Sequence, residues 1–171
     1  MFQRSRSQQS AAIERATGSP LTHMGLVLPH DGHLMVVEAV EPVRWTEWDA
    51  WGARAVAGTV EVRRLSDPTP LTAGVLLRMA EVAEGMLGKH YDDAFSWSDE
   101  RIYCSELVYK VFDRGGGLQV GRLRALRDFN LRDAVVSAAL RERYRAAVPL
   151  DETVIAPSDM AADPQLTAVR E

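Results

Sequence analysis

Residues 101–110 read Arg-Ile-Tyr-Cys-Ser-Glu-Leu-Val-Tyr-Lys and contain Cys104, the single cysteine of the chain. Downstream of Cys104 the apolar residues fall at helical spacing, at Leu107, Val108, Val111 and Phe112. Glu106 stands where a carboxylate stabilises the first turn of a helix. The pattern therefore predicts a helix that begins at Cys104 and ends at the glycines 115–117.

A single cysteine can form neither an internal disulfide nor a metal centre built from several thiolates. Three alternatives are left, namely a buried core residue, an incidental free thiol or a nucleophile. At the start of a helix, unpaired N–H groups and the positive end of the helix dipole lower the pKa of a thiol. Position alone leaves the alternatives open, and a nucleophile would need partners elsewhere in the chain.

The composition bounds the class of protein. The chain has 171 residues, of which 46% are hydrophobic and 26% charged, which is ordinary for one globular domain over residues 1–171. A net charge of −4 gives no support for nucleic acid as a partner, and no apolar run is long enough for a membrane span. The first ten residues lack the apolar core of a signal peptide. We expect a cytoplasmic location, which an export segment upstream of Met1 would change.

Periodicity and turn residues predict an α+β domain with an antiparallel sheet. The predicted helices cover residues 6–17, 71–87, 104–115 and 131–144, and the predicted strands cover 21–28, 33–40, 59–65 and 152–156. Pro29-His30-Asp31-Gly32 is turn chemistry, so the first two strands form a hairpin. Trp45, Trp48 and Trp51 are spaced like one face of a short helix, and we interpret them as an aromatic cover over the core.

A cysteine nucleophile needs a base, usually histidine, and often a third group that orients the imidazole. Of the four histidines, His23 lies inside a predicted strand, whereas His30, His33 and His90 lie in the turn, at a strand start and in a surface loop. His23 is therefore the candidate base, and a satisfied structural histidine is the alternative.

The predicted hairpin supplies a partner for His23. A loop centred between His30 and Asp31 places Glu38 directly opposite His23, and a loop centred on Asp31-Gly32 places it diagonally on the same face. Glu38 shares that face with apolar residues, where a carboxylate requires a partner. The residues thus predict a Cys104–His23–Glu38 constellation, with a purely structural His–Glu pair as the alternative.

Several segments then form a distinctive combination. They are Phe-Gln-Arg-Ser-Arg-Ser-Gln-Gln-Ser at 2–10, Ala-Thr-Gly-Ser-Pro-Leu-Thr-His-Met-Gly at 16–25, Val-Val-Glu-Ala at 36–39 and Tyr-Cys-Ser-Glu-Leu-Val at 103–108, with Gly-Lys-His-Tyr-Asp at 88–92 and Ala-Pro-Ser-Asp at 156–159. Together they resemble the YiiX/YebB-like group of the circularly permuted NlpC/P60 superfamily of papain-like cysteine hydrolases, over residues 2–165. Members commonly begin a few residues earlier, with a short strand that leads into the Phe-Gln segment, so we expect either that this strand is lost or that the start of the sequence is truncated.

The resemblance implies a permuted papain-like fold, in which an antiparallel sheet packs against the helix that carries the nucleophile. It implies Cys104 as nucleophile, His23 as general base and then acid, and Glu38 as the residue that orients His23. The backbone N–H of Cys104 would hold the oxyanion, with Tyr91 or Tyr103 as a substrate-binding side chain. In this permuted order the histidine precedes the cysteine, as it does here.

The predicted function is that of a cysteine hydrolase, an amidase or peptidase acting through a thioester on a small peptide-like or amide substrate. Permuted relatives include enzymes that transfer lipid acyl groups, so a lipid acyl hydrolase or acyltransferase is an alternative, which an apolar pocket lined by residues 45–51 would favour. A non-catalytic ligand-binding module is a second alternative. The histidines show no ligand spacing, so no metal and no organic cofactor are expected.

Overall fold

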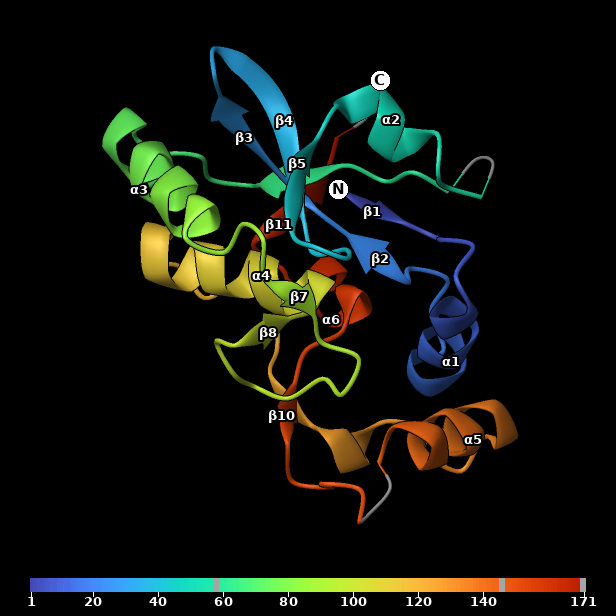
Figure 1. The fold of residues 1–171 in the computed structure, drawn as a ribbon. Helices are drawn as coiled ribbons and strands as arrows, with labels where there is room; N and C mark the ends of the chain where they lie inside the picture. Colours follow the sequence, from blue (N-terminus) through green and yellow to red (C-terminus); the bar gives the residue numbers. More distant parts are fainter. Residues whose placement is uncertain (57–58, 145–146, 170–171) are drawn as a thin grey trace.

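The computed structural model describes residues 1–56, 59–144 and 147–169 (Figure 1). The α-helices are α1 (Gln8–Thr17), α2 (Trp48–Gly52), α3 (Ala73–Glu84), α4 (Cys104–Lys110), α5 (Ala134–Arg143) and α6 (Pro157–Ala161), with a π-helix η1 (Val111–Gly116) and a 3₁₀ helix η2 (Leu126–Asp128). The strands are β1 (Phe2–Gln3), β2 (His23–Met24), β3 (Leu26–His30), β4 (His33–Glu38), β5 (Arg44–Thr46), β6 (Arg63–Leu65), β7 (His90–Tyr91), β8 (Arg101–Ile102), β9 (Arg124–Ala125), β10 (Thr153–Val154) and β11 (Leu166–Ala168).

The strands pair mostly antiparallel, which confirms the predicted mixture of helices and antiparallel strands. Strands β3, β4 and β5 form one antiparallel sheet, and β1–β2, β6–β11 and β9–β10 are antiparallel pairs, whereas β7 and β8 pair in parallel. Helix α4 lies at the centre of the molecule and contacts β2 and β4 (Figure 1). The predicted packing of a sheet against the Cys104 helix is therefore present.

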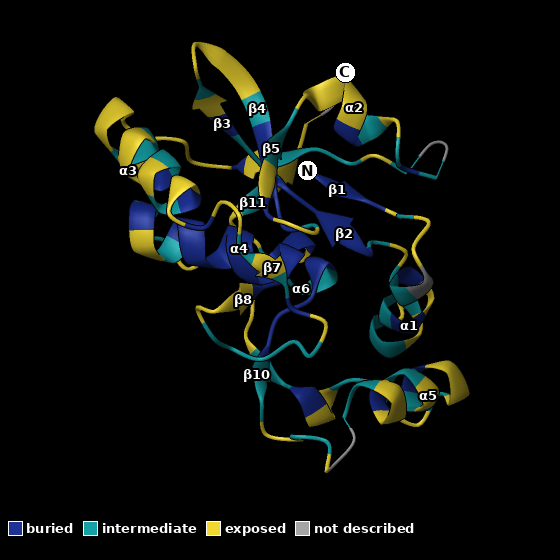
Figure 2. Ribbon diagram, in the orientation of Figure 1, coloured by how far each residue is buried: buried dark blue, intermediate teal, exposed yellow. Residues whose placement is uncertain are grey.

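Helix α4 is the most enclosed helix of the fold. Each of its residues is buried, and Figure 2 shows its ribbon in dark blue while α3 and α5 expose much of their surface. Its polar side chains all have partners: the Ser105 hydroxyl donates to the Ile155 carbonyl at 2.7 Å, and Glu106 accepts from the Tyr103 N–H and from Lys110. Such a satisfied, buried helix holds Cys104 in a fixed position.

The hairpin turn is centred on Asp31-Gly32. Both residues have positive φ, 48° and 78°, and the register pairs Leu26 with Val37 and His30 with His33. A two-residue hairpin loop of this kind needs two positive-φ residues, which an aspartate and a glycine adopt more readily than a histidine. The loop centred between His30 and Asp31 is therefore wrong, and the loop centred on Asp31-Gly32 is the one formed.

The predicted strand over residues 21–28 is interrupted at Gly25. A Cβ atom at Gly25 would lie 2.5 Å from Val36 Cγ1 and 3.2 Å from the Trp51 ring nitrogen, so this close approach requires glycine. The interruption separates β2 from the hairpin, and β2 pairs with β1 so that Gln3 lies opposite His23. The first strand is present as the two residues Phe2–Gln3.

Several other predicted bounds need correction. Helix α1 begins at Gln8, later than predicted, because Ser7 caps it by accepting from the Ser10 N–H. The predicted strand 59–65 contains only β6, with Glu61 forming an isolated bridge to Phe2. Four other predicted elements are present but shorter: 71–87 corresponds to α3, 131–144 to α5, 33–40 to β4 and 152–156 to β10. The predicted helix 104–115 is present but changes type, from the α-helix α4 to the π-helix η1.

The three tryptophans do not share one short helix, although their spacing alone would allow it. Trp45 lies on β5, which pairs with β4, and only Trp48 and Trp51 lie on α2. Backbone pairing with the edge of the hairpin takes Trp45 out of the helical pattern, a long-range effect that local spacing does not reveal.

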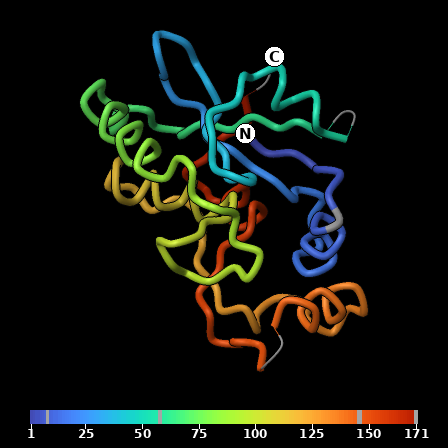
Figure 3. Tube along the Cα trace, in the orientation of Figure 1, coloured from blue at the N-terminus to red at the C-terminus, as the bar shows by residue number. Residues whose placement is uncertain are grey.

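Segments distant in sequence come together on either side of α4. Helix α3 packs against η1, and α1 packs against α5, so the blue N-terminal helix and the orange late helix lie side by side in Figure 3. Among the described residues, the helices are all too short or too polar to cross a bilayer.

Candidate active site

The structure brings His23, Glu38 and Cys104 together. His23 lies on β2, Glu38 is the last residue of β4 and Cys104 is the first residue of α4. The distance between His23 Nε2 and Glu38 Oε2 is 2.7 Å, and the Cys104 thiol lies close enough to the imidazole to raise the pKa of His23. Since Nε2 faces Glu38, Nδ1 is the nitrogen left for the sulfur. The three side chains thus form a line from carboxylate through imidazole to thiol.

Glu38 is fully buried, and both of its oxygens have partners. Oε2 faces His23, while Oε1 accepts from the Thr46 hydroxyl at 2.7 Å and from the Arg54 guanidinium. Burial alone would raise the pKa of Glu38, but the hydrogen bonds from His23 and Thr46 and the charge of Arg54 hold it below its usual value. Glu38 is therefore an ionised, fixed acceptor for His23.

The charges of His23 and Cys104 are coupled. Burial would lower the pKa of His23, but hydrogen bonds and charge interactions with Cys104 and Glu38 raise that pKa to about 9. Burial would raise the pKa of Cys104, but His23 and the N–H groups of Met24 and Ser105 lower it. The arrangement therefore favours a thiolate–imidazolium pair near neutral pH.

Trp51 fixes the ring of His23 from one side. Its side chain is completely buried and stacks on the imidazole, with ring centroids 5.9 Å apart and an interplanar angle of 24°. The interpretation of an aromatic cover over the core fits Trp51, which is buried, and Trp45, which packs against the main core and stacks on His30, but it does not fit the exposed Trp48.

The two predicted substrate-binding tyrosines occupy different positions. Burial, together with the charges of Cys104 and Asp93, raises the pKa of Tyr91 well above its usual value. The Tyr103 hydroxyl instead accepts from the Ile155 N–H at 3.2 Å. The Tyr91 hydroxyl is thus electrostatically coupled to Cys104, whereas the Tyr103 hydroxyl is held by the backbone of Ile155. Within the described residues, the Cys104 N–H donates to no protein acceptor.

The remaining histidines lie away from this constellation. His90 is exposed and bonds Glu41 through Nδ1 at 2.5 Å, and His30 faces Glu84 from the end of β3. Neither contacts Cys104, which agrees with the choice of His23.

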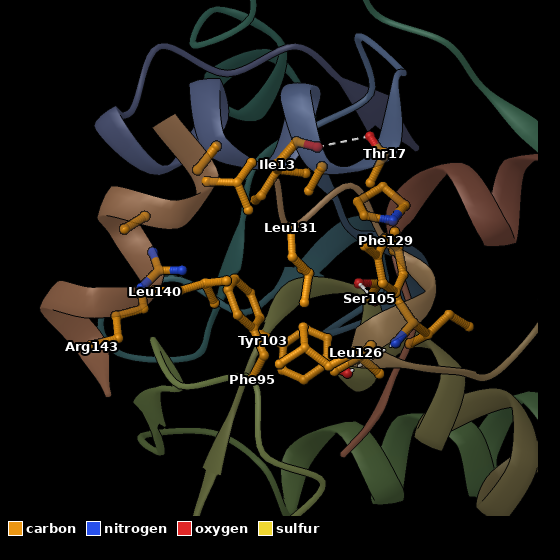
Figure 4. Close-up of a pocket in the computed structure, with 18 of the residues that line it drawn as sticks. Ile13, Thr17, Phe95, Tyr103, Ser105, Leu126, Phe129, Leu131, Leu140 and Arg143 are labelled. Atoms are coloured by element: carbon orange, nitrogen blue, oxygen red, sulfur yellow. Dashed lines mark hydrogen bonds between the residues drawn. The ribbon is translucent and has the colours of Figure 1, made fainter. Parts of the chain in front are cut away.

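An apolar pocket opens onto Cys104 between α1 and α5 (Figure 4). In the close-up, Ile13 of α1 and Leu140 of α5 point into the same space as Leu131. Its other lining residues are Ala12, Ala16, Thr17, Phe95, Tyr103, Ser105, Leu126, Phe129, Val136, Ala139, Arg143, Val154, Ile155, Ala156 and Pro157. Residues 45–51 do not line it, so the apolar pocket lies elsewhere than the tryptophan segment considered from the sequence.

A polar groove lies on the other side of His23. Gln3, Thr22, Tyr91 and Asp93 are among its lining residues, together with His23 itself. The Gln3 side chain is buried, and its Oε1 has no partner among the described residues. The Cys104–His23 pair thus stands at the junction of an apolar pocket and a polar groove.

Sequence reasoning missed Thr46, Arg54 and the pocket. A buried carboxylate such as Glu38 implies a cation or hydroxyl nearby, but no spacing indicates which residue supplies it. The pocket arises from α1 meeting α5, a contact between segments far apart in the chain.

Comparisons with known proteins agree with this architecture. The model of the family described as permuted papain-like amidase enzyme, YaeF/YiiX, C92 family, matches residues 1–170. The uncharacterized protein YiiX of Escherichia coli K12 is 41% identical over 169 residues, which covers 99% of this chain and 83% of that protein. A crystal structure of YiiX from Escherichia coli O157:H7, described as a metalloprotein, superposes with a TM-score of 0.92 at 42% identity, covering 99% of this chain and 93% of that one. The predicted resemblance to the YiiX group is confirmed, and the chain belongs to the permuted papain-like amidase family of YaeF and YiiX.

Proposed function

We propose that this protein is a cysteine amidase in which Cys104 is the nucleophile, His23 the general base and acid, and Glu38 the residue that orients and charges His23. The observation that carries the proposal is the continuous Glu38–His23–Cys104 line, in which the imidazolium and the thiolate stabilise each other. A nucleophile held by a base, itself held by a third group, is the arrangement that nucleophilic catalysis requires.

In the first step the Cys104 sulfur attacks the amide carbonyl, and a carbon–sulfur bond forms. In this proposal the Cys104 N–H, which has no protein acceptor among the described residues, and the Tyr91 hydroxyl donate to the developing oxyanion, and loss of one such donor typically slows a reaction about 10²- to 10³-fold. His23 then gives its proton to the leaving nitrogen as the carbon–nitrogen bond breaks.

In the second step water hydrolyses the thioester. Neutral His23 takes a proton from the water, which attacks the acyl carbon, and the carbon–sulfur bond breaks. The products are a carboxylic acid and the free enzyme, whose thiolate and imidazolium are restored. Glu38 keeps the imidazole oriented through both steps.

The apolar pocket favours an acyl-lipid substrate as the second candidate. Its walls include aliphatic and aromatic side chains of α1, α5 and η2 (Figure 4), and Cys104 is one of its lining residues. Burial of a hydrocarbon chain there would stabilise the complex by about 0.8 kcal/mol for each buried CH₂ group. The acyl part of the substrate is thus expected to be apolar, and the same chemistry would cleave an acyl ester or transfer the acyl group.

The residues of this chain do not fit a bound metal at the site. A relative is described as a metalloprotein, but here both oxygens of Glu38 are engaged by His23, Thr46 and Arg54, so Cys104 and His23 have no third His, Cys, Asp or Glu ligand among the described residues. Across the described residues no group of three or more His, Cys, Asp or Glu side chains is arranged to hold a metal ion. We therefore derive no step through a metal.

Mass spectrometry of the intact protein tests the proposal. Brief incubation with an activated octanoyl ester should add one octanoyl group to the wild-type protein, at Cys104, and the adduct should disappear on standing. The Cys104→Ala variant should gain none, and His23→Ala should be acylated far more slowly. Hydrolysis of amides that continues undiminished in Cys104→Ala would refute the assignment.

A further inference from the structure

Arg143 is the one ionised side chain on the otherwise apolar and hydroxyl-bearing wall of the pocket. It is the last residue of α5 and is half-buried. A guanidinium beside an apolar cavity loses part of its hydration, and this cost is repaid only when an anion or an aromatic face lies against it.

The position of Arg143 is fixed by aromatic rings that lead to Cys104. Its guanidinium lies 5.0 Å from the centre of the Phe95 ring. Phe95 meets Tyr103 edge to face at 5.2 Å, and Tyr103 immediately precedes Cys104. The positive charge of Arg143 also acts on the Tyr91 hydroxyl, whose pKa Cys104 affects too. Arg143 and Cys104 thus line the same pocket, and the rings of Phe95 and Tyr103 lie between them along the wall.

Arg143 has no acidic partner among the described residues, unlike several other arginines in this half of the molecule. Arg15 pairs with Asp133, and Arg124 pairs with Asp159 at 3.4 Å. Arg141, two residues before Arg143 on the same helix, is exposed and donates to the Ser137 hydroxyl. The donors of Arg143 are thus available to a ligand that enters the pocket.

We propose that Arg143 binds a carboxylate of the substrate next to the scissile amide, so that the protein takes N-acylated amino acids. Their carboxylate would lie at Arg143, and their acyl chain would lie along the apolar side chains that line the same pocket. The planar guanidinium suits a carboxylate because two parallel N–H groups can donate to its two oxygens. The assignment of the scissile bond rests on the proposed amidase function, whereas the binding of the carboxylate does not.

Calorimetry on the inactive Cys104→Ala variant tests the binding, with N-octanoylglycine and its neutral amide N-octanoylglycinamide as probes. The two differ only in the carboxylate. A charge-assisted hydrogen bond to Arg143 should make the acid bind about 10- to 100-fold more tightly. Adding Arg143→Gln should abolish this preference, and adding Arg141→Gln, the matched control on the same helix, should leave it unchanged. Equal affinity for the two probes, or a preference that survives Arg143→Gln, overturns the proposal.

Turnover by the Cys104-containing protein separates this proposal from the proposed function. Both the carboxylate site and the amidase function are supported if the protein releases glycine from N-octanoylglycine. In that case kcat/KM should fall at least tenfold in Arg143→Gln and stay unchanged in Arg141→Gln. Preferential binding of the acid without release of glycine supports the carboxylate site and overturns its assignment to substrate cleavage. Equal hydrolysis of acid and amide, insensitive to Arg143→Gln, leaves the amidase function standing and refutes the role of Arg143.

Discussion

Replacement of Glu38 by glutamine should shift the pH dependence of the reaction. Glutamine keeps the size of the side chain and a hydrogen bond acceptor for His23, but it removes the negative charge 2.7 Å from Nε2. Arg54 loses its partner, yet its side chain is 37% exposed and can be solvated. The substitution therefore acts mainly on the charge state of His23.

The magnitude follows from the pKa of His23. A rise from 6.5 to about 9 corresponds to about 3 kcal/mol in favour of the imidazolium, at about 1.4 kcal/mol per pH unit, shared between Cys104 and Glu38. Loss of roughly half of this should lower the pKa of His23 by about one pH unit. The alkaline limb of kcat/KM, which reports loss of the imidazolium proton, should fall from near pH 9 toward about pH 8.

The pH dependence of the free energy of unfolding should also change in Glu38→Gln, because it depends on the same pKa of His23. Because the folded pKa of His23 lies above its unfolded value, its contribution to stability is complete below pH 6.5 and is lost as the pH rises through about 9. The free energy of unfolding of Glu38→Gln should therefore fall less steeply over this range. Glu84→Gln, which removes a carboxylate facing His30, is the matched control and should change neither profile. An alkaline limb that stays in place in Glu38→Gln would refute the role given to Glu38.

Three further substitutions probe the pocket, the strand interruption and the choice of histidine. Ala139→Trp places an indole in the apolar pocket. The kcat/KM for octanoyl substrates should therefore fall at least tenfold more than that for acetyl substrates with the same leaving group, and an equal loss for both would contradict an acyl pocket. Gly25→Ala pushes a methyl group against Val36 and should lower the free energy of unfolding by about 1–3 kcal/mol in urea titrations, whereas Gly52→Ala, with open space around it, serves as the control. His90→Ala, on the exposed surface, should leave kcat/KM within about twofold of the wild type at every pH, and a large loss would question His23 as the base.

The helix that decides the fold could be predicted from the sequence because its signals are local. Its start at Cys104, the role of Glu106 in its first turn and its glycine stop all depend on residues within one or two turns. The π-helical geometry of its second half could not be predicted, since it depends on packing against α3. Gly115 lies so close to Met79 of α3 that a Cβ there would meet the backbone of that helix at 2.6 Å.

The proximity of His23 and Glu38 was predicted from the hairpin, but the pairing of the strands was only partly correct. Both loop positions kept the two residues on one face, so the contact did not depend on the choice between them. The interruption at Gly25 escaped prediction because it is imposed by Val36 and Trp51 from other elements. Thr46, Arg54 and Arg143 reach the site through tertiary contacts that no local pattern encodes.

The rate of Cys104 alkylation by iodoacetamide at pH 6 tests the central claim most directly. Since His23 lowers the pKa of Cys104, the wild-type protein should react at least about tenfold faster than a free cysteine peptide at this pH, and His23→Ala should lose the advantage. Cys104 is the only cysteine, so the adduct needs no mapping. Alkylation no faster than that of the free peptide, with the acyl pocket empty, would return Cys104 to the role of a buried core residue.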